Sequence, residues 1–141
     1  SSLTEIFMQR ILTILLLLPG MLLAAGTDTP ARLQAGYAAE ALAASPAAGP
    51  LSAERGRQFF TSRHGGDWSC ASCHTTDARK NGRHAVTGKV LKPLAPAANP
   101  DRFTDATKVE KWFRRNCKDV LGRECTAREK GDVLTYLQSL R

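Results

Sequence analysis

Cys70-Ala71-Ser72-Cys73-His74 carries the strongest signal in this sequence of 141 residues. Two thiols separated by two residues and followed directly by an imidazole form the C-x-x-C-H pattern of a c-type haem attachment site. In such a site, the two thiols bind the vinyl groups of one porphyrin as thioethers, and the histidine binds the iron as an axial ligand. The motif therefore predicts one covalently bound haem, held by Cys70, Cys73 and His74.

The same cysteine spacing also occurs in zinc sites and in thioredoxin-like redox motifs. A structural zinc site needs four ligands, and the other two cysteines, Cys117 and Cys125, lie far downstream with a different spacing. A redox motif belongs to a βαβ pattern, and the sequence has no strand-like alternation. The context therefore favours haem attachment over both alternatives.

The start of the sequence resembles a targeting segment. A start-like Met8 is followed by the basic Arg10 and by an apolar run over residues 11–18. This order is typical of a secretory signal peptide, which we expect to occupy residues 1–25 together with some extra upstream sequence. An uncleaved membrane anchor is the alternative, but the uncharged run is shorter than the about 18 residues of a spanning helix.

Export would place residues 26–141 in the bacterial periplasm as one mono-haem domain. Thiols tend to pair in an oxidising compartment. With Cys70 and Cys73 used by the haem, a disulfide between Cys117 and Cys125 would close a short loop. Two unpaired buried thiols are the alternative.

The sequence carries a net charge of +7, and the predicted leader contributes one acidic and one basic residue to it. The predicted domain therefore keeps the charge of +7, which can guide docking onto an acidic partner. Nucleic acid is not expected as a partner, because the sequence lacks the basic helix and aromatic pattern of such binding.

Helical segments account for most of the predicted domain. Ser52 is a candidate N-cap, and Thr126 with Glu129 has the spacing of a capping box. The segment over residues 75–98 is rich in glycine and proline without an apolar period, so we expect a long loop that the cofactor orders. The sequence thus predicts an all-α fold with helices over residues 31–44, 53–61, 107–116 and from 127 to near the C-terminus.

The second axial ligand of the iron is less obvious from the residues. Methionine, a common choice, is excluded because Met8 and Met21 both lie in the predicted leader. His64 lies in a glycine-rich turn and is expected to be an exposed loop residue. His84, in the long loop, is a candidate distal ligand, whereas local sequence favours Asn116 as a helix C-cap.

Several stretches resemble the family of sphaeroides haem protein (SHP) and its relative cytochrome c″. The resemblance covers nearly the whole predicted domain, from the Ala31–Tyr37 segment to the C-terminal helix. It includes irregular segments, where composition alone would not produce it. The matching stretches are Thr87–Lys89, Pro93–Pro96, Arg102–Asp105, Lys108–Trp112, Arg115–Cys117 and Gly122–Thr126.

This resemblance implies a class I-like cytochrome c fold with an extra N-terminal helix and one disulfide, between Cys117 and Cys125. In the family, the residue directly before the first of these cysteines is the distal iron ligand. It is asparagine in SHP-type members and histidine in cytochrome c″-type members. The resemblance therefore implies that Asn116 is the distal ligand, with His84 as the alternative.

The function implied by the resemblance depends on this weak ligand. An amide oxygen can hold ferric iron and should release ferrous iron, so that reduction opens a site for NO, O2 or CO. The family also implies electron transfer with a dihaem cytochrome c. We expect a monomer that has no membrane association after signal cleavage.

Two other functions stay open. One is an ordinary electron-transfer cytochrome with fixed ligation by His74 and His84. The other is a haem enzyme that reduces O2 or NO, for which the sequence offers no convincing acid–base pair near the iron.

Overall fold

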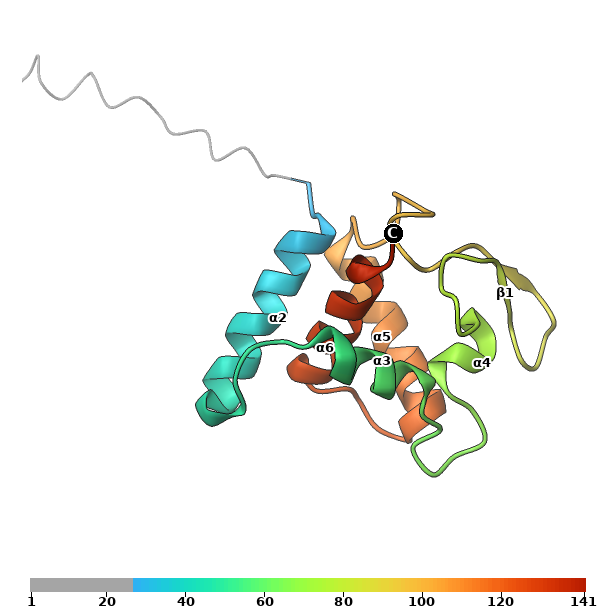
Figure 1. Ribbon diagram of the computed structural model, residues 1–141. Helices are drawn as coiled ribbons and strands as arrows, with labels where there is room; N and C mark the ends of the chain where they lie inside the picture. Colours follow the sequence, from blue (N-terminus) through green and yellow to red (C-terminus); the bar gives the residue numbers. More distant parts are fainter. Residues whose placement is uncertain (1–26) are drawn as a thin grey trace, which may run out of the picture.

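The computed structural model describes residues 27–141, so the predicted signal peptide lies outside the described residues. The extra helix α2 lies on the far side of α3, α5 and α6 from α4 (Figure 1). Within the described range, no helix has the length and apolar character needed to cross a membrane. The elements are α2 (Pro30–Ala44), the 3-10 turn η1 (Pro46–Ala48), α3 (Ala53–Thr61), α4 (Cys70–His74), β1 (Gly82–Arg83), β2 (Val90–Leu91), α5 (Ala106–Leu121) and α6 (Ala127–Ser139).

The all-α prediction is confirmed, and the two strands form only a short antiparallel hairpin. Helix starts follow their predicted caps. The Ser52 hydroxyl accepts a hydrogen bond from the Arg55 amide at 3.2 Å. Thr126 and Glu129 form the reciprocal capping box at the start of α6. Such caps satisfy amide groups that the first turn of a helix leaves without partners.

Helix α5 is longer than the sequence predicted. It begins after the N-cap Asp105 and continues to Leu121, where Gly122 ends it with a left-handed φ of 71°. Glycine adopts this conformation without the cost of a Cβ and is common directly after a helix. The interpretation of Asn116 as a C-cap is therefore wrong, because Asn116 lies inside the helix.

The long loop after α4 is ordered by hydrogen bonds of its own, in contrast to the expectation that the cofactor alone would order it. The carbonyl of Ala78 accepts hydrogen bonds from the amides of Leu94 and Ala95, both at 2.9 Å. The Arg102 guanidinium donates to the Pro93 carbonyl at 2.9 Å. Together with the hairpin, these contacts fix the loop beside α4.

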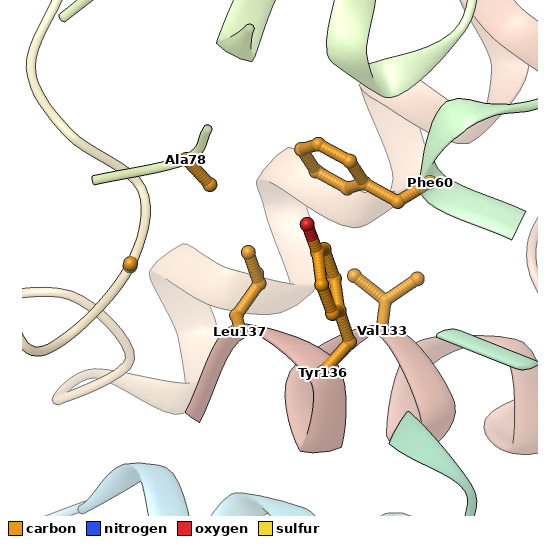
Figure 2. Close-up of a cluster of buried hydrophobic side chains, with 6 residues drawn as sticks. Phe60, Ala78, Val133, Tyr136 and Leu137 are labelled. Carbon is orange, nitrogen blue, oxygen red and sulfur yellow. The ribbon is translucent and has the colours of Figure 1, made fainter. Parts of the chain in front are cut away.

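The core forms where α3 crosses α6. Gly56 faces the backbone of α6 so closely that a Cβ at this position would lie 1.9 Å from the Asp132 carbonyl oxygen. Beside this contact, the buried rings of Phe60 and Tyr136 pack at 5.6 Å between centroids. Figure 2 shows them with Val133 on α6. Close backbone approach thus allows the aromatic core to form.

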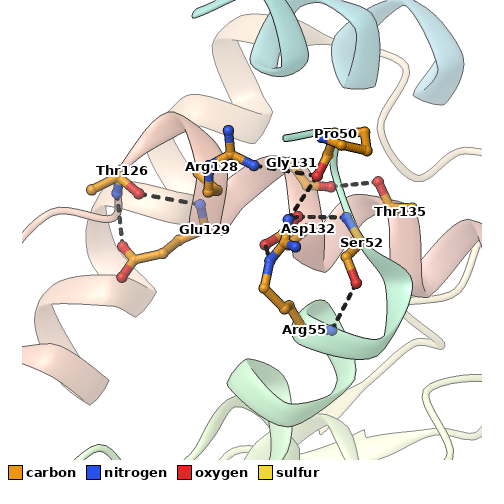
Figure 3. Close-up of polar contacts among 9 residues, drawn as sticks. All are labelled: Pro50, Ser52, Arg55, Thr126, Arg128, Glu129, Gly131, Asp132 and Thr135. Atoms are coloured by element: carbon orange, nitrogen blue, oxygen red, sulfur yellow. Dashed lines mark hydrogen bonds and ion pairs between the residues drawn. The ribbon is translucent and has the colours of Figure 1, made fainter. Parts of the chain in front are cut away.

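A buried carboxylate fastens the same crossing. Asp132 on α6 accepts hydrogen bonds from the Ser52 amide at 2.7 Å and from Arg55 Nε at 2.8 Å. Arg55 also donates a second bond to it at 3.0 Å (Figure 3). A buried charge is costly unless it is paired and hydrogen-bonded, and this carboxylate has both kinds of partner. The start of α3 is therefore held against α6.

We predict that Gly56→Ala lowers the free energy of unfolding by about 2 kcal/mol or more, because the new methyl group forces α3 away from α6. Gly36→Ala is the matched control. It lies in α2 with open space at its Cβ position, and we expect a gain of roughly 0.5–1 kcal/mol from helix propensity. Denaturant unfolding followed by circular dichroism measures both. Equal effects of the two variants would contradict the close approach.

Candidate haem site

Helix α4 is a single turn that carries the C-x-x-C-H motif. Its N-cap Ser69 accepts a hydrogen bond from the Ser72 amide at 3.2 Å, and Ser72 Oγ accepts one from the Ser69 amide at 2.9 Å. Residues three apart in a helix lie on the same side, so the turn brings Cys70 and Cys73 together. Neither cysteine is in a disulfide.

A tight turn ends α4 directly after His74. Thr75 has a φ of 63°, which is unusual for a residue with a branched side chain. Its hydroxyl donates to the Asp77 carbonyl at 2.6 Å and accepts from the Asp77 amide at 3.1 Å. These two hydrogen bonds stabilise the turn after His74 and so fix the position of this histidine.

Burial lowers the pKa of His74 to about 4, with a smaller contribution from the charge of Arg102. The imidazole is therefore neutral at pH 7, which is the form that binds a metal ion. Burial likewise raises the pKa of the Cys70 thiol to about 11. Both shifts follow mainly from the burial of the motif.

The hairpin packs directly against α4. A Cβ on Gly82 would lie 2.0 Å from the Cys73 carbonyl oxygen, so glycine allows β1 to approach the helix. The Ala85 amide lies 3.3 Å from Cys73 Sγ. The motif is therefore held from one side by the hairpin.

Partly buried apolar side chains from four parts of the chain lie around the core next to the motif. A porphyrin is a flat and largely apolar group, so this surface suits its faces. The two thiols, the neutral imidazole and this apolar rim together fit a c-type haem. The rim consists of Phe59 on α3, Leu94 and Phe103 in the long loop, Phe113 on α5, and Leu140 after α6, beside Cys70 and Ala71 of the motif.

Asn116, the distal ligand implied by the resemblance, is exposed on α5. Its side chain makes no hydrogen bond with any described residue, so its amide oxygen is available. Phe113 and Trp112 lie three and four residues earlier and therefore on the same side of the helix. Trp112 is 47% exposed. The surroundings of Asn116 on α5 thus include two large aromatic groups.

The two other histidines both have local partners. His84 lies between the strands, where its Nδ1 accepts hydrogen bonds from the amides of Val86 and Thr87 at 3.3 and 3.1 Å. His64 is exposed, as expected, and its Nε2 lies 2.8 Å from the Phe59 carbonyl oxygen. His84 therefore has Nε2 as the nitrogen left for a ligand role.

A disulfide joins Cys117 to Cys125, with the two Cα atoms 5.7 Å apart. It confirms the predicted pairing, and both cysteines are buried. The bond links the last turns of α5 to the segment just before α6. Because Cys117 directly follows Asn116, the bond fixes the backbone next to the candidate ligand.

Sequence analysis missed a polar cluster behind α5. The Tyr37 hydroxyl donates to Glu110 Oε1, and Lys130 Nζ donates to Glu110 Oε2 at 2.7 Å. The partners lie 73 and 20 positions apart, so no local pattern could have indicated the contact. The sequence had marked Tyr37 only as part of a resembling segment.

The helical fold and the C-x-x-C-H turn, with its neutral histidine, define a c-type cytochrome. Comparison with known proteins agrees. Residues 46–137 match a family described as "Domain of unknown function (DUF1924)". The chain is also 48% identical over 134 residues to the cytochrome c-type protein SHP of Cereibacter sphaeroides, an alignment that covers 92% of this chain and 98% of SHP.

Solved structures show the same relationship. Oxidised SHP, an oxygen-binding cytochrome c, superposes with a TM-score of 0.71 at 47% identity, covering 81% of this chain and 99% of SHP. The solution structure of cytochrome c″ from Methylophilus methylotrophus, described in terms of haem-ligand detachment, has a TM-score of 0.66 at 38% identity. That alignment covers 77% of this chain and 90% of cytochrome c″.

The chain belongs to the family of SHP-type cytochromes c, which includes cytochrome c″ among its relatives. The expected class I-like fold, with its extra N-terminal helix and one disulfide, is thereby confirmed. Proteins of this class carry a covalently attached haem. Haem c is accordingly the cofactor of this chain.

We predict that Cys70→Ala and Cys73→Ala each leave the haem attached through one thioether, and that the double variant loses covalent attachment. Mass spectrometry of the denatured protein measures the bound haem. The pair Cys117→Ala and Cys125→Ala removes two cysteines outside the motif and should keep the full haem mass. Covalent haem in the variant lacking both Cys70 and Cys73 would contradict the assignment.

Proposed function

We propose that this chain is a periplasmic mono-haem protein that transfers electrons and, when reduced, releases Asn116 so that a diatomic ligand such as O2, NO or CO can bind. The proposed domain spans residues 26–141, after removal of a signal peptide over residues 1–25. The observation that carries the proposal is the asparagine inside α5, with its amide unengaged among the described residues and a disulfide at the next residue. The oxygen-binding description of SHP supports it.

In this proposal, each residue of the motif has a separate role. Cys70 and Cys73 form the thioethers, and His74 provides the proximal ligand as a neutral imidazole. The hydrogen bonds of Thr75 hold that histidine in place. When bound, the haem supplies an iron that exchanges one electron and has one face available for an exchangeable ligand.

Asn116 acts as the exchangeable protein ligand on the other face. A neutral amide oxygen is a hard and weak donor, so it favours the more highly charged ferric ion over the ferrous ion. Phe113 and Trp112, on the same side of α5, limit the size of what can approach.

The charge of the chain supports an electron partner with an acidic surface. The sequence has a net charge of +7, and α5 exposes several cations close to Asn116. Complementary charge raises association rates more than affinity, which suits a partner that must dissociate after transfer. We propose a dihaem cytochrome c as this partner. The exposed cations on α5 are Lys108, Lys111, Arg114, Arg115 and Lys118.

We predict that the wild-type protein, reduced with dithionite, is high-spin and binds CO. Asn116→His should be low-spin in the oxidised state, because an imidazole nitrogen is a stronger ligand for ferric iron than an amide oxygen. Optical spectra of oxidised, reduced and CO-treated protein measure all three states.

His84→Ala is the matched control for Asn116→His, because it removes the alternative ligand. Its spectra should equal those of the wild type. A wild-type protein that is low-spin in both states, and that changes spin when His84 is removed, would support fixed His74/His84 ligation instead.

The disulfide gives a separate prediction. Removing it with Cys117→Ala and Cys125→Ala should lower the free energy of unfolding by about 2.5 kcal/mol, as estimated for a loop of this length. It should also loosen Asn116, so that azide displaces it from the ferric protein more easily. Azide titration and denaturant unfolding measure the two effects. An unchanged azide affinity would show that the disulfide stabilises the fold without restraining Asn116.

A further inference from the structure

We infer that Tyr37, on the extra helix α2, is a positioning residue for Asn116, acting through Glu110 and Phe113 of α5. This inference rests on the proposed role of Asn116 as a weak ligand. It assigns a structural role to α2, the helix that precedes the cytochrome core. In this role, α2 acts as a brace for α5, the helix that carries the proposed ligand.

The brace is a partly buried cluster of Tyr37, Glu110 and Lys130 that joins three helices. Tyr37 is 7% exposed, and its hydroxyl donates to Glu110 of α5. The other oxygen of Glu110 accepts a hydrogen bond from Lys130 of α6 at 2.7 Å. The Lys130 Nζ also lies 5.6 Å from the centroid of the Tyr37 ring, within cation–π distance. One carboxylate therefore ties α2 and α6 to α5.

The protonation states favour these bonds. Burial raises the pKa of Tyr37, and the neighbouring Glu110 raises it further, so the hydroxyl stays a donor. Burial acts to raise the pKa of Glu110, but the hydrogen bonds from Lys130 and Tyr37 outweigh it and the pKa is lowered. The carboxylate is thus ionised, and hydrogen bonds to an ionised group are stronger than neutral ones.

Tyr37 also contacts the part of α5 that carries the proposed ligand. The rings of Tyr37 and Phe113 meet edge to face, with centroids 6.0 Å apart and planes at 89°. Glu110, Phe113 and Asn116 follow one another at intervals of three residues, so each is a neighbour of the next on the surface of α5. A shift of α5 at Glu110 or Phe113 therefore moves Asn116.

The disulfide holds α5 on the other side of the ligand, at Cys117. The brace and the disulfide thus flank Asn116 along the helix. Such restraint most strengthens a weak bond such as the one proposed between the amide and the iron. The conformational entropy that the asparagine side chain would lose on binding has already been lost in the folded protein. We expect that loosening the brace weakens Asn116 as a ligand without removing it.

Tyr37→Phe tests the inference, because it removes the hydroxyl and keeps the ring. The readout is the dissociation constant of azide from the ferric holoprotein, in which azide competes with Asn116. We expect azide to bind about fivefold more tightly to the variant, the effect of losing roughly one hydrogen bond. If Tyr37→Phe folds poorly, Glu110→Gln takes its place in the test. This variant removes the charge of Glu110 and keeps its shape, and we expect the azide affinity to change in the same direction.

Gln34→Leu is the matched control. Gln34 lies on the same helix and pairs with Gln138 of α6, so its loss loosens α2 without touching α5. We expect unchanged azide affinity in this variant. Hydrogen exchange of the backbone amides around residues 113–117 gives a second readout, which should accelerate in Tyr37→Phe and not in Gln34→Leu.

The Asn116→Ala background separates this inference from the proposed function. If Asn116 is the ligand, its removal tightens azide binding, and adding Tyr37→Phe has no further effect. No change in azide affinity on Asn116→Ala would refute the proposed function. A normal response to Asn116→Ala, with Tyr37→Phe no different from Gln34→Leu, would overturn the positioning role and leave the proposed function intact.

Discussion

The backbone contact between Gly56 and the carbonyl of Asp132 is the constraint on which the rest of the molecule depends. No other residue type fits between these helices without moving one of them. The contact brings Phe60 and Tyr136 together and lets the Asp132 side chain reach the start of α3. The crossing also positions α3, which residues 62–69 connect to the haem attachment motif on α4.

Sequence analysis succeeded where the physics is local. The C-x-x-C-H spacing depends on one helical turn, and the caps at Ser52 and Thr126 depend on hydrogen bonds across three residues. Such patterns are complete within a short window, so the sequence alone contains them. The exclusion of methionine as a ligand also needed composition alone, and it stays a prediction that depends on removal of the leader.

Sequence analysis failed where order comes from distant partners. The loop after α4 looked dependent on the cofactor, yet Arg102 and the Ala78 carbonyl hold it across many positions. Helix α5 was ended too early, at Asn116, although Gly122 is the residue that suits a helix end. The contact of Tyr37 with Glu110 joins two helices that nothing in the local sequence connects. The role of Asn116 was suggested only by family resemblance, since its local pattern favoured a cap.

Helix α5 combines two properties that a detachable ligand needs. The helix is anchored through Glu110 and Cys117, and its exposed side carries Asn116 among several cations. If Asn116 binds iron as proposed, these cations lie near the metal and electrostatically favour the ferrous state, which has one positive charge less. Anchoring strengthens the bond to ferric iron, and the cations oppose it. The balance between anchoring and charge would decide how readily the amide leaves on reduction. The same helix therefore sets both the strength of the amide–iron bond and the ease with which it breaks.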